Sequence, residues 1–247
     1  MTSKSNKVLI FTPTYNEKMN VGIWLDKVLS LDLEADLLVV DDSSTDGTLE
    51  TLMLREESDS RLKVHIRAGK CGVGSAHAWA INYALSSGYS HLVAMDADLS
   101  HNPSDIPKLL GASTMANYVV ATRNKRKGGK NELPGLRKLW SLSANVLCRI
   151  VIPTGLTEYT TSFRCYDRKA MEALLSNSPK NEGYSYFIEV TEILYQSRLK
   201  LDEVPITFHN REFEESKIPK MQIFISAGTI LRLVLGRIYF LMGFGGK

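Results

Sequence analysis

The chain has 247 residues, with 30 Lys and Arg, 27 Asp and Glu, and a formal net charge of +3. That length is ample for a large buried core. An apolar share of 44% and a charged share of 23% exclude disordered, collagenous and coiled-coil proteins. The charge is too small to indicate a nucleic-acid partner. Three widely spaced cysteines (Cys71, Cys148 and Cys165) exclude a disulfide scaffold and indicate a reducing compartment. The polar start, Met1–Lys7, has no signal-peptide pattern.

The first half of the chain alternates strand and helix patterns. Short, continuous apolar runs predict strands at Val8–Phe11, Leu37–Val40, Lys63–Ile66, His91–Met95 and Tyr118–Ala121. Apolar residues at helical spacing between the first four runs predict helices around residues 21–29, 49–53 and 76–84. Short apolar strands separated by helices are typical of a mostly parallel sheet that is buried on both faces. The sequence therefore predicts an α/β fold.

The second half is less regular. Residues 125–130 form a basic, glycine-containing loop, and the patterns at 136–152 and 186–199 predict two helices, the first with an apolar face. Residues 200–208 predict a strand that Pro205 interrupts, so we expect it at a sheet edge. No linker or internal repeat divides the chain, which favours one continuous domain.

The C-terminal stretch Gln222–Met242 is the most hydrophobic part of the sequence and has one narrow polar stripe. Its length is sufficient to span a bilayer. Arg232 and Arg237 oppose a span, because each costs roughly 2.5–3.5 kcal/mol at the bilayer centre. A buried core helix and a helix in the membrane interface are the alternatives, and we expect the interfacial helix. Residues 218–247 would then be an apolar appendage to a domain formed by residues 1–217.

Two carboxylates follow the fourth predicted strand, at Asp96 and Asp98. In open α/β sheets, ligands bind outside the carboxyl ends of the strands. Two carboxylates at this spacing can both reach one divalent cation, and hard oxygen ligands suit Mg²⁺ or Mn²⁺, which commonly bridge to substrate phosphates. The alternative interpretation is a solvated acidic loop that caps the next helix.

A second acidic segment, Asp41–Thr48, follows the second predicted strand. An EF-hand is excluded because the bidentate glutamate of its twelfth position would fall on Met53. Asp46 or Thr45 is suited to cap the following helix. That role leaves Asp41 and Asp42 unexplained, and two carboxylates at the end of a buried strand are costly without partners.

Other catalytic motifs are missing or incomplete. Residues 69–74 are rich in glycine but lack the Gly-Lys-Ser/Thr ending of a P-loop, no His-x-x-x-His pair indicates zinc, and no Gly-x-Ser-x-Gly indicates an α/β-hydrolase. Between Arg123 and Lys138 there are seven basic residues, and Glu132 is the only acid. This segment is either a solvated loop or a mobile cationic loop beside a metal site, which would suit a polyanionic substrate.

Taken in order, these motifs resemble the family 2 inverting glycosyltransferases with the GT-A fold, and most of all the dolichol-phosphate mannosyltransferases and bacterial polyprenol-phosphate glycosyltransferases. The pieces that indicate family 2 are Pro13-Thr14-Tyr15-Asn16-Glu17, Asp41–Thr48 and Asp96–His101. The segments that narrow the resemblance to the polyprenol-phosphate group are Ala121-Thr122-Arg123, Thr161–Arg164, Glu203–Ile206, and Arg211 with Ser216-Lys217. The resemblance implies a single GT-A (Rossmann-like) domain with a mostly parallel central sheet.

The resemblance also implies roles for the matching residues. The base and ribose of a sugar nucleotide would lie against Pro13, Tyr15, Glu17, Val40 and Asp42. A metal on the diphosphate would be held by Asp96 and Asp98, with Met95 and Ala97 lining the same loop. The phosphates of donor and acceptor would be gripped by Arg123, Arg211 and Lys217, and the catalytic residues would be Asp98 and Arg123.

The sequence departs from the family pattern in two places. Ser162 stands where the family has a glycine before Phe-Arg, and Glu214-Glu215 precedes Ser216-Lys217 where a glycine is usual. The Gln-x-x-Arg-Trp of processive members such as cellulose synthases is absent, since Gln196 is followed by Ser-Arg-Leu. A polymerising enzyme is therefore not expected.

The implied activity is metal-dependent transfer of a sugar, mannose or glucose, from a nucleoside-diphosphate sugar of the GDP-mannose or UDP-glucose class to a polyprenol or dolichol phosphate. The cofactor would be Mg²⁺ or Mn²⁺. The enzyme would be peripheral on the cytoplasmic face of a membrane, and the need for a membrane-spanning partner subunit is left open. A lipid phosphate is already ionised, so it needs no strong base, whereas an alcohol acceptor does.

Three other functions stay open at this point. One is a soluble family 2 glycosyltransferase that acts on a sugar hydroxyl, and another is a non-catalytic subunit that binds sugar nucleotides. The third is a nucleotidyltransferase, which would usually open with a glycine-rich basic loop in place of residues 12–17.

Overall fold

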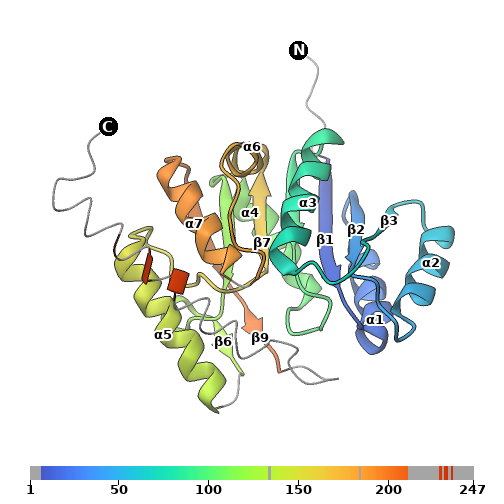
Figure 1. Ribbon diagram of the computed structural model, residues 1–247, viewed down its shortest axis with the longest axis horizontal. Coiled ribbons are helices and arrows are strands. Elements are labelled where there is room, and N and C mark those ends of the chain that lie inside the picture. Colours follow the sequence, from blue (N-terminus) through green and yellow to red (C-terminus); the bar gives the residue numbers. More distant parts are fainter. Residues whose placement is uncertain are drawn as a thin grey trace.

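A computed structural model of the protein describes residues 7–132, 135–183, 185–210, 228–229, 231–232 and 235. A central sheet is covered by helices on both faces (Figure 1). The strand order is β3-β2-β1-β4-β7-β5-β8. These strands are β1 (Val8–Thr14), β2 (Ala35–Asp41), β3 (Leu62–Ile66), β4 (His91–Ala94), β5 (Tyr118–Thr122), β7 (Arg164–Asp167) and β8 (Leu201–Pro205).

The sheet is mostly parallel, as the sequence predicts. All five strands expected in the first half are present, and only β7 runs antiparallel, between β4 and β5. Two short strands, β6 (Lys130–Asn131) and β9 (Thr207–Phe208), pair with each other outside the main sheet. Because the strands on both sides of β7 point the same way, their carboxyl ends meet at one edge of the sheet.

Helices cover both faces of the sheet. One face packs against α3 (Val73–Ser86), α5 (Gly135–Val151), α6 (Arg168–Ser176) and α7 (Tyr186–Gln196). The other face packs against α1 (Lys18–Leu29), α2 (Thr48–Ser58) and α4 (Ile106–Ser113), which follows the 3₁₀ turn η1 (Pro103–Asp105). A second 3₁₀ turn, η2 (Lys125–Lys127), lies in the basic loop.

The alternation of side chains along the strands explains the two faces. On β1, Leu9 and Phe11 belong to the core on the α3 side, and Ile10 belongs to the core on the α1 side. Both sides are dry, because Phe11 and Trp24 are completely buried. Each large apolar side chain buried in this way contributes roughly 1.5–3 kcal/mol. Strands that are apolar without a break therefore become the centre of a three-layer fold.

The structure confirms the two helices and the edge strand that the sequence predicts in the second half of the chain. The helix expected at residues 186–199 ends earlier, at Gln196, because Arg198 adopts a left-handed φ of 56° that a helix cannot contain. β8 lies at the sheet edge and ends at Pro205, which has no N–H to donate. The chain then continues into β9, so the basic loop is tied down by the β6–β9 pair.

Most of the predicted C-terminal helix, Gln222–Met242, lies outside the described residues. Those that are described, at 228–229, 231–232 and 235, are helical. Thr229 is buried and accepts a hydrogen bond from the side chain of Asn181, and Arg232 pairs with Glu189 of α7. In the part of the chain that the structure describes, no helix is both long and apolar enough to cross a membrane. The division at residue 217 and the interfacial helix stay predictions.

His77, on α3, is a completely buried polar group in the core. Its ring makes edge contacts with Phe11 and Phe187, with centroids 5.0 Å away in both cases. Neither ring nitrogen has a hydrogen-bond partner. Burial, together with the positive charge of Arg164, lowers the pKa of His77 to about 3. The imidazole is therefore neutral in the folded protein and titrates only after unfolding.

We expect His77 to make the protein less stable as the pH falls. Below pH 6.5 the unfolded chain binds a proton on this residue that the folded chain does not, so stability is complete above that pH and declines toward pH 3. Between pH 7.5 and pH 5.5 this amounts to about 1.4 kcal/mol. Urea unfolding of wild type and His77→Leu at both pH values measures it. Equal pH dependence in the two proteins would contradict the assignment.

Candidate active site

The predicted base-binding and ribose-binding residues gather where β1 and β2 end side by side. Pro13 faces Val40 and Thr14 faces Asp41 across the two strands. Asp41 is completely buried and accepts hydrogen bonds from the Thr14 hydroxyl at 2.7 Å and the Ser44 hydroxyl at 2.6 Å. The hydrogen bonds of Asp41 are thus made within the fold, whereas Asp42 has other partners.

The loops after β1 and β2 hold each other. The Asn16 N–H donates to the Ser44 hydroxyl at 2.8 Å, and the Glu17 N–H donates to the Thr48 hydroxyl at 2.8 Å. The N-cap of α2 is Gly47, not Asp46 or Thr45 as predicted, but Asp46 still accepts from the backbone and hydroxyl of Thr48, the first residue of the helix. Partial burial raises the pKa of Asp46, but these hydrogen bonds and one from Lys18 outweigh it and lower the pKa overall. The loop that carries Tyr15 and Glu17 is therefore fixed before any ligand arrives.

Asp42 forms an ion pair that the sequence analysis did not identify. Arg67, which directly follows β3, donates from Nε to the Asp42 carboxylate at 2.5 Å and from Nη1 to Ser75 at 2.5 Å. The Cys71 N–H donates to the other Asp42 oxygen at 3.2 Å. Arg67 was detectable in the sequence as a cation that directly follows a predicted strand. Nearby, the Lys70 ammonium lies 4.2 Å from the centre of the Tyr15 ring.

The two candidate metal ligands follow β4, which lies directly beside β1. Asp98 is buried, Asp96 is partly exposed, and Met95 and Ala97 are buried. The Ser100 N–H donates to Asp98 at 3.0 Å, which turns the loop back over the strand end. Leu99, between them, has a φ of 61°, a left-handed conformation that is costly for a branched side chain.

The donor set of this loop fits Mg²⁺ or Mn²⁺, which take oxygen ligands. Among the described residues, no group of three or more His, Cys, Asp or Glu could hold a metal by itself. The assignment of Asp96 and Asp98 to a metal stays a prediction.

Arg123, just after β5, is held by a buried carboxylate. Its Nε donates to Glu158 at 3.0 Å, and its Nη2 lies 3.2 Å from the hydroxyls of Ser141 and Thr160. Its Nη1 makes no hydrogen bond within the part of the chain described here. The guanidinium is therefore fixed in orientation, and its predicted role as a phosphate ligand stays a prediction.

Glu158 is the centre of this network and was not among the predicted site residues. Besides Arg123, it accepts hydrogen bonds from the Thr160 backbone and hydroxyl and from the Asn145 amide of α5. Burial raises the pKa of Glu158, but the charge of Arg123 and these hydrogen bonds outweigh it and lower the pKa overall. Glu158 is thus ionised, and it supplies the counter-charge that lets Arg123 be nearly buried.

One aromatic ring connects Arg123 to the acidic loop. The ring of Phe208, on β9, lies 4.7 Å from the Arg123 guanidinium carbon and 5.2 Å from the His101 ring. The His209 N–H donates to the Ser100 carbonyl at 2.9 Å. The segment after β8 therefore contacts the acidic loop through His209 and Arg123 through Phe208.

Arg164 organises the segment between α5 and β7. It is completely buried, and it donates to the carbonyls of Thr161, Tyr159 and Phe187 at 2.6, 2.7 and 2.8 Å. Ser162, which replaces the family glycine, does not have a left-handed φ, so a glycine is not needed here for the backbone. Arg164 is therefore a positioning residue for this loop.

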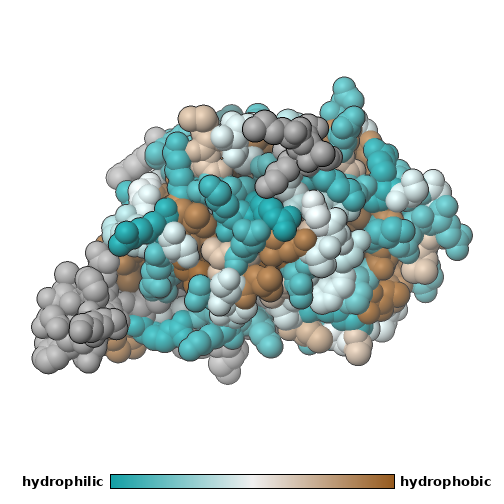
Figure 2. Space-filling model, turned by 90° about the horizontal axis from the view of Figure 1, so that it is seen from above, coloured by the Kyte–Doolittle hydropathy of each residue, from teal (hydrophilic) through white to brown (hydrophobic). Residues whose placement is uncertain are grey.

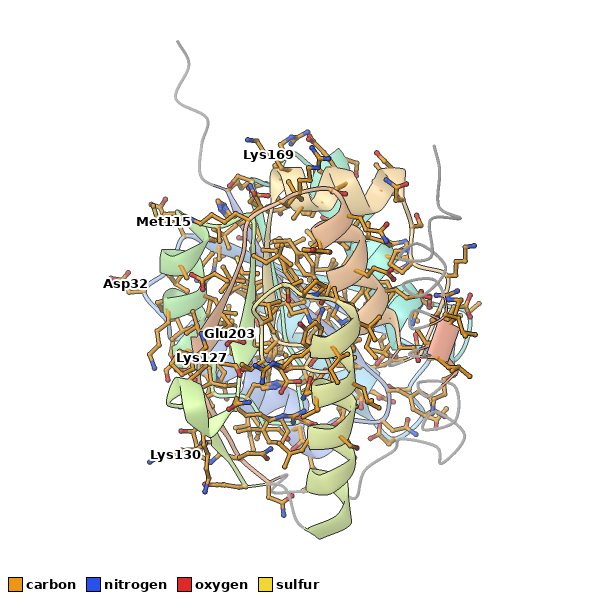
Figure 3. The ribbon with its side chains drawn as sticks, turned by 90° about the vertical axis from the view of Figure 1, so that its left-hand side faces the viewer. Asp32, Met115, Lys127, Lys130, Lys169 and Glu203 are labelled. Carbon is orange, nitrogen blue, oxygen red and sulfur yellow. The ribbon has the colours of Figure 1, made fainter. Side chains whose placement is uncertain are left out.

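Glu203, on β8, ties the site to the basic loop. It accepts hydrogen bonds from the backbone and the hydroxyl of Thr157 at 2.7 and 3.0 Å, and Lys127 of η2 lies 3.6 Å away. Figure 3 labels Glu203 beside Lys127, with Lys130 further along the loop. The remaining predicted phosphate ligands, Arg211 and Lys217, lie outside the described residues, and their role stays a prediction.

The chain is similar to known proteins over most of its length. Residues 9–175 match the family model described as Glycosyl transferase family 2. An undecaprenyl-phosphate mannosyltransferase from Micrococcus luteus is 34% identical over 212 residues, which cover 86% of this chain and 87% of that protein. A polyprenol monophosphomannose synthase from Mycolicibacterium smegmatis is 33% identical over 218 residues, which cover 87% of this chain and 82% of that protein.

Solved structures show the same fold. Glucosyl-3-phosphoglycerate synthase from Mycobacterium tuberculosis, in complex with Mn²⁺, UDP and glucosyl-3-phosphoglycerate, superposes with a TM-score of 0.67 at 18% identity, covering 94% of this chain and 80% of that one. The same enzyme with Mn²⁺, UDP and phosphoglyceric acid gives a TM-score of 0.68, also at 18% identity, covering 94% and 78%.

We expect the loss of the Glu158 charge to destabilise the protein strongly. Glu158→Gln leaves the Arg123 guanidinium nearly buried without its counter-charge, which costs about 3 kcal/mol. The matched control is Glu172→Gln, which removes the exposed Arg168–Glu172 pair and costs less than about 0.5 kcal/mol. Urea unfolding at pH 7 compares the two. If both variants lose the same small amount of unfolding free energy, the Arg123–Glu158 pair is not the structural centre of the site.

Proposed function

The chain belongs to glycosyl transferase family 2, and we propose that it transfers a hexose, mannose in the first instance, from a nucleoside-diphosphate sugar to a polyprenyl phosphate. The observation that carries the proposal is the arrangement at one sheet edge. The Asp42–Arg67 pair, the Asp96–Asp98 loop and Arg123 follow adjacent parts of the sheet. Relatives named for transfer of mannose to undecaprenyl or polyprenyl phosphate support the choice of sugar and acceptor.

The donor would lie across the ends of β2, β1 and β4, in that spatial order. Its nucleoside would meet Pro13, Tyr15 and Asp42, and its diphosphate would meet Asp96 and Asp98. These carboxylates would hold Mg²⁺ or Mn²⁺, which neutralises charge on a departing nucleoside diphosphate. Glucosyl-3-phosphoglycerate synthase, which has the same fold, was solved in complex with Mn²⁺ and UDP, and this supports a divalent metal as cofactor.

The chain's own contribution to catalysis would be preorganised positive charge. Arg123 is oriented by Glu158, Ser141 and Thr160 before substrate binds, so it needs no reorganisation during the reaction. A phosphate oxygen beside Nη1 would be stabilised as negative charge builds up on it. Arg123 would then contact the phosphates of donor and acceptor.

A lipid phosphate acceptor requires little of the protein beyond positioning. Its oxygen is ionised at neutral pH and can attack the anomeric carbon directly, with inversion. His101, the histidine next to the acidic loop, is buried between Phe163 and Phe208 and hydrogen bonds to Thr161, so it is not placed as a base for an alcohol. This favours a phosphate acceptor over the sugar hydroxyl of a soluble family 2 enzyme.

One experiment tests donor and acceptor together. The purified protein is incubated with Mn²⁺, a polyprenyl phosphate in detergent, and each of a panel of radiolabelled sugar nucleotides. We expect label from GDP-mannose in the organic phase, and product that is released by mild acid, as expected of a sugar phosphodiester. Label that appears only in water-soluble glycans would favour the hydroxyl acceptor, and no transfer from any donor would favour a non-catalytic subunit.

Asp98→Asn is expected to abolish this transfer while leaving the fold intact, because it removes one of two carboxylates that hold the metal. The control is Asp105→Asn on η1, a carboxylate of similar burial whose partner is Lys108 on the next helix. Activity is measured in saturating Mn²⁺, and the fold is checked by circular dichroism. Near-normal turnover of the Asp98 variant would exclude it as a metal ligand.

Arg123→Lys is expected to lower kcat by about 10²–10³-fold, the usual loss when one preorganised donor is removed. Lysine keeps the charge but cannot donate to Glu158 and a phosphate in one plane. Sugar-nucleotide affinity, measured by calorimetry, should change much less than kcat. An unchanged kcat with weakened donor binding would instead assign Arg123 to ground-state binding only.

A further inference from the structure

Glu189 is a buried carboxylate that the proposed reaction does not use. It lies in the first turn of α7, and its side chain is 4% exposed. It accepts hydrogen bonds from the backbone N–H groups of Lys180 and Asn181 at 2.8 and 2.9 Å, and from the Asn181 amide at 2.6 Å. A carboxylate buried this deeply is costly without partners, and hydrogen bonds to an ionised group are strong. Glu189 therefore holds the backbone at residues 180–181 against α7.

Another partner of Glu189 comes from the C-terminal segment. Arg232 pairs with the same carboxylate oxygen that the Asn181 amide contacts, and Thr229 accepts a hydrogen bond from that amide at 3.4 Å. The exposure of the two charged side chains is unequal, at 4% for Glu189 and 54% for Arg232. A cavity of about 600 Å³, which Glu192 also lines, opens beside the pair. Arg232 can therefore leave the carboxylate while the carboxylate stays in place.

The segment that α7 holds in this way supports the glycine-rich loop at residues 69–74. The Gly74 N–H donates to the Glu182 carbonyl at 2.7 Å. The two backbones are so close that a Cβ on Gly74 would lie 2.8 Å from the Asn181 carbonyl oxygen. A Cβ on Gly72, which has a φ of 90°, would lie 2.6 Å from the Glu182 carbonyl oxygen. The glycines of this loop, which lacks the ending of a P-loop, therefore serve a close contact between two loops.

The glycine-rich loop in turn holds the nucleoside end of the proposed site. The Cys71 N–H donates to Asp42 at 3.2 Å, and the Gly72 carbonyl accepts from Arg67 Nη2 at 3.1 Å. The Ser75 hydroxyl accepts from Arg67 Nη1 at 2.5 Å and donates to the Cys71 carbonyl at 2.7 Å. A continuous series of contacts therefore connects the C-terminal segment to the carboxylate that is predicted to bind the base and ribose.

All of these contacts lie at the carboxyl ends of the parallel strands. α3 follows β3, and α7 precedes the parallel strand β8, so both helices begin at this end of the sheet. Figure 1 shows the described residues of the C-terminal segment beside α7. Figure 2 views the opposite end of the strands, where hydrophilic residues predominate among the coloured atoms. The described part of the segment therefore contacts the domain at the same end of the sheet as the proposed site.

We propose that Arg232 and Glu189 form a latch through which the docked C-terminal segment positions the nucleoside end of the site. With the latch closed, the segment at residues 180–182 and the glycine-rich loop hold Asp42 and Arg67 ready for a nucleoside. With the latch open, both loops gain freedom, and ordering them again lowers the affinity for the sugar nucleotide. Glu189 is then a positioning residue. The proposal rests on the proposed function, because it takes the nucleoside site from it.

The nucleotide affinity of the full chain tests the latch. GDP and UDP are titrated by calorimetry in the presence of Mn²⁺, and the one that wild type binds more tightly is used for every variant. Arg232→Ala changes a half-exposed side chain and should weaken binding about five- to tenfold. Arg232→Lys keeps the charge and should restore most of the affinity. Glu192→Gln is the matched control, because Glu192 lies on the same helix and lines the same cavity but accepts from Gln196, and it should bind like wild type.

Two further measurements separate positioning from a loss of stability. In steady-state kinetics, Arg232→Ala should raise the KM for the sugar nucleotide and leave kcat and the KM for the acceptor nearly unchanged. Gly74→Ala, whose added methyl group displaces the Asn181 carbonyl, should weaken nucleotide binding by itself. Adding Arg232→Ala to it should then have little further effect, because both act through the same contacts. Urea unfolding checks the fold of each variant, and Arg232→Ala decides alone if Gly74→Ala does not fold.

Several outcomes would overturn the latch and leave the proposed function standing. They are an unchanged nucleotide affinity in Arg232→Ala, an equal loss in Glu192→Gln, and additive effects of the Gly74 and Arg232 substitutions. Equal damage to the kinetics of sugar nucleotide and acceptor would also overturn it. If wild type binds the nucleotide but glycosylates no polyprenyl phosphate, the proposed function fails and the affinity comparison still decides the latch. A wild type that binds neither nucleotide would overturn both.

Discussion

The site depends on one buried ion pair, Arg123–Glu158. A carboxylate that is almost inaccessible to water is tolerable only because a guanidinium and several hydrogen-bond donors face it. Those donors come from the end of β5, from α5 and from the segment before β7, so the pair fixes three parts of the chain to one another. The same geometry that keeps Glu158 ionised leaves a nitrogen of Arg123 directed elsewhere. The same interaction stabilises the fold and fixes the orientation of Arg123.

Backbone strain gathers at the same edge of the sheet. Asn16, Ser43 and Leu99 all adopt left-handed φ angles, of 56°, 57° and 61°, and each lies in a loop at the carboxyl end of a strand. Such conformations cost on the order of 1 kcal/mol each for residues other than glycine. Hydrogen bonds within the first two loops offset that cost, since Asn16 accepts from Thr45 and Ser43 donates to Arg67. The left-handed residues at this edge are therefore held in place by the hydrogen bonds of the loops that contain them.

The sequence predicted the elements whose physics is local. Five apolar strands and the helices α1, α2, α3, α5 and α7 were readable from periodicity, and the family resemblance is confirmed by the family match and by relatives above 30% identity. β7 could not be predicted from the sequence, because its first residue, Arg164, is of a type that usually lies at the surface. Only the structure shows the buried carbonyls to which it donates. Arg67 and Glu158 were missed for the same reason: their partners, Asp42 and Arg123, are distant in the chain, and only the folded sheet edge brings them together.

The two sides of α5 have different surroundings. Positions 141, 145 and 148 face the domain, and two of them hold the Arg123–Glu158 network. Positions 142, 146 and 150 are each one or two residues further along and point away, because a helix turns by 3.6 residues. A helix that was apolar on only one side would bury its apolar side chains in the domain and leave a polar exterior. α5 thus holds the Arg123–Glu158 network with one side and presents apolar side chains to solvent with the other.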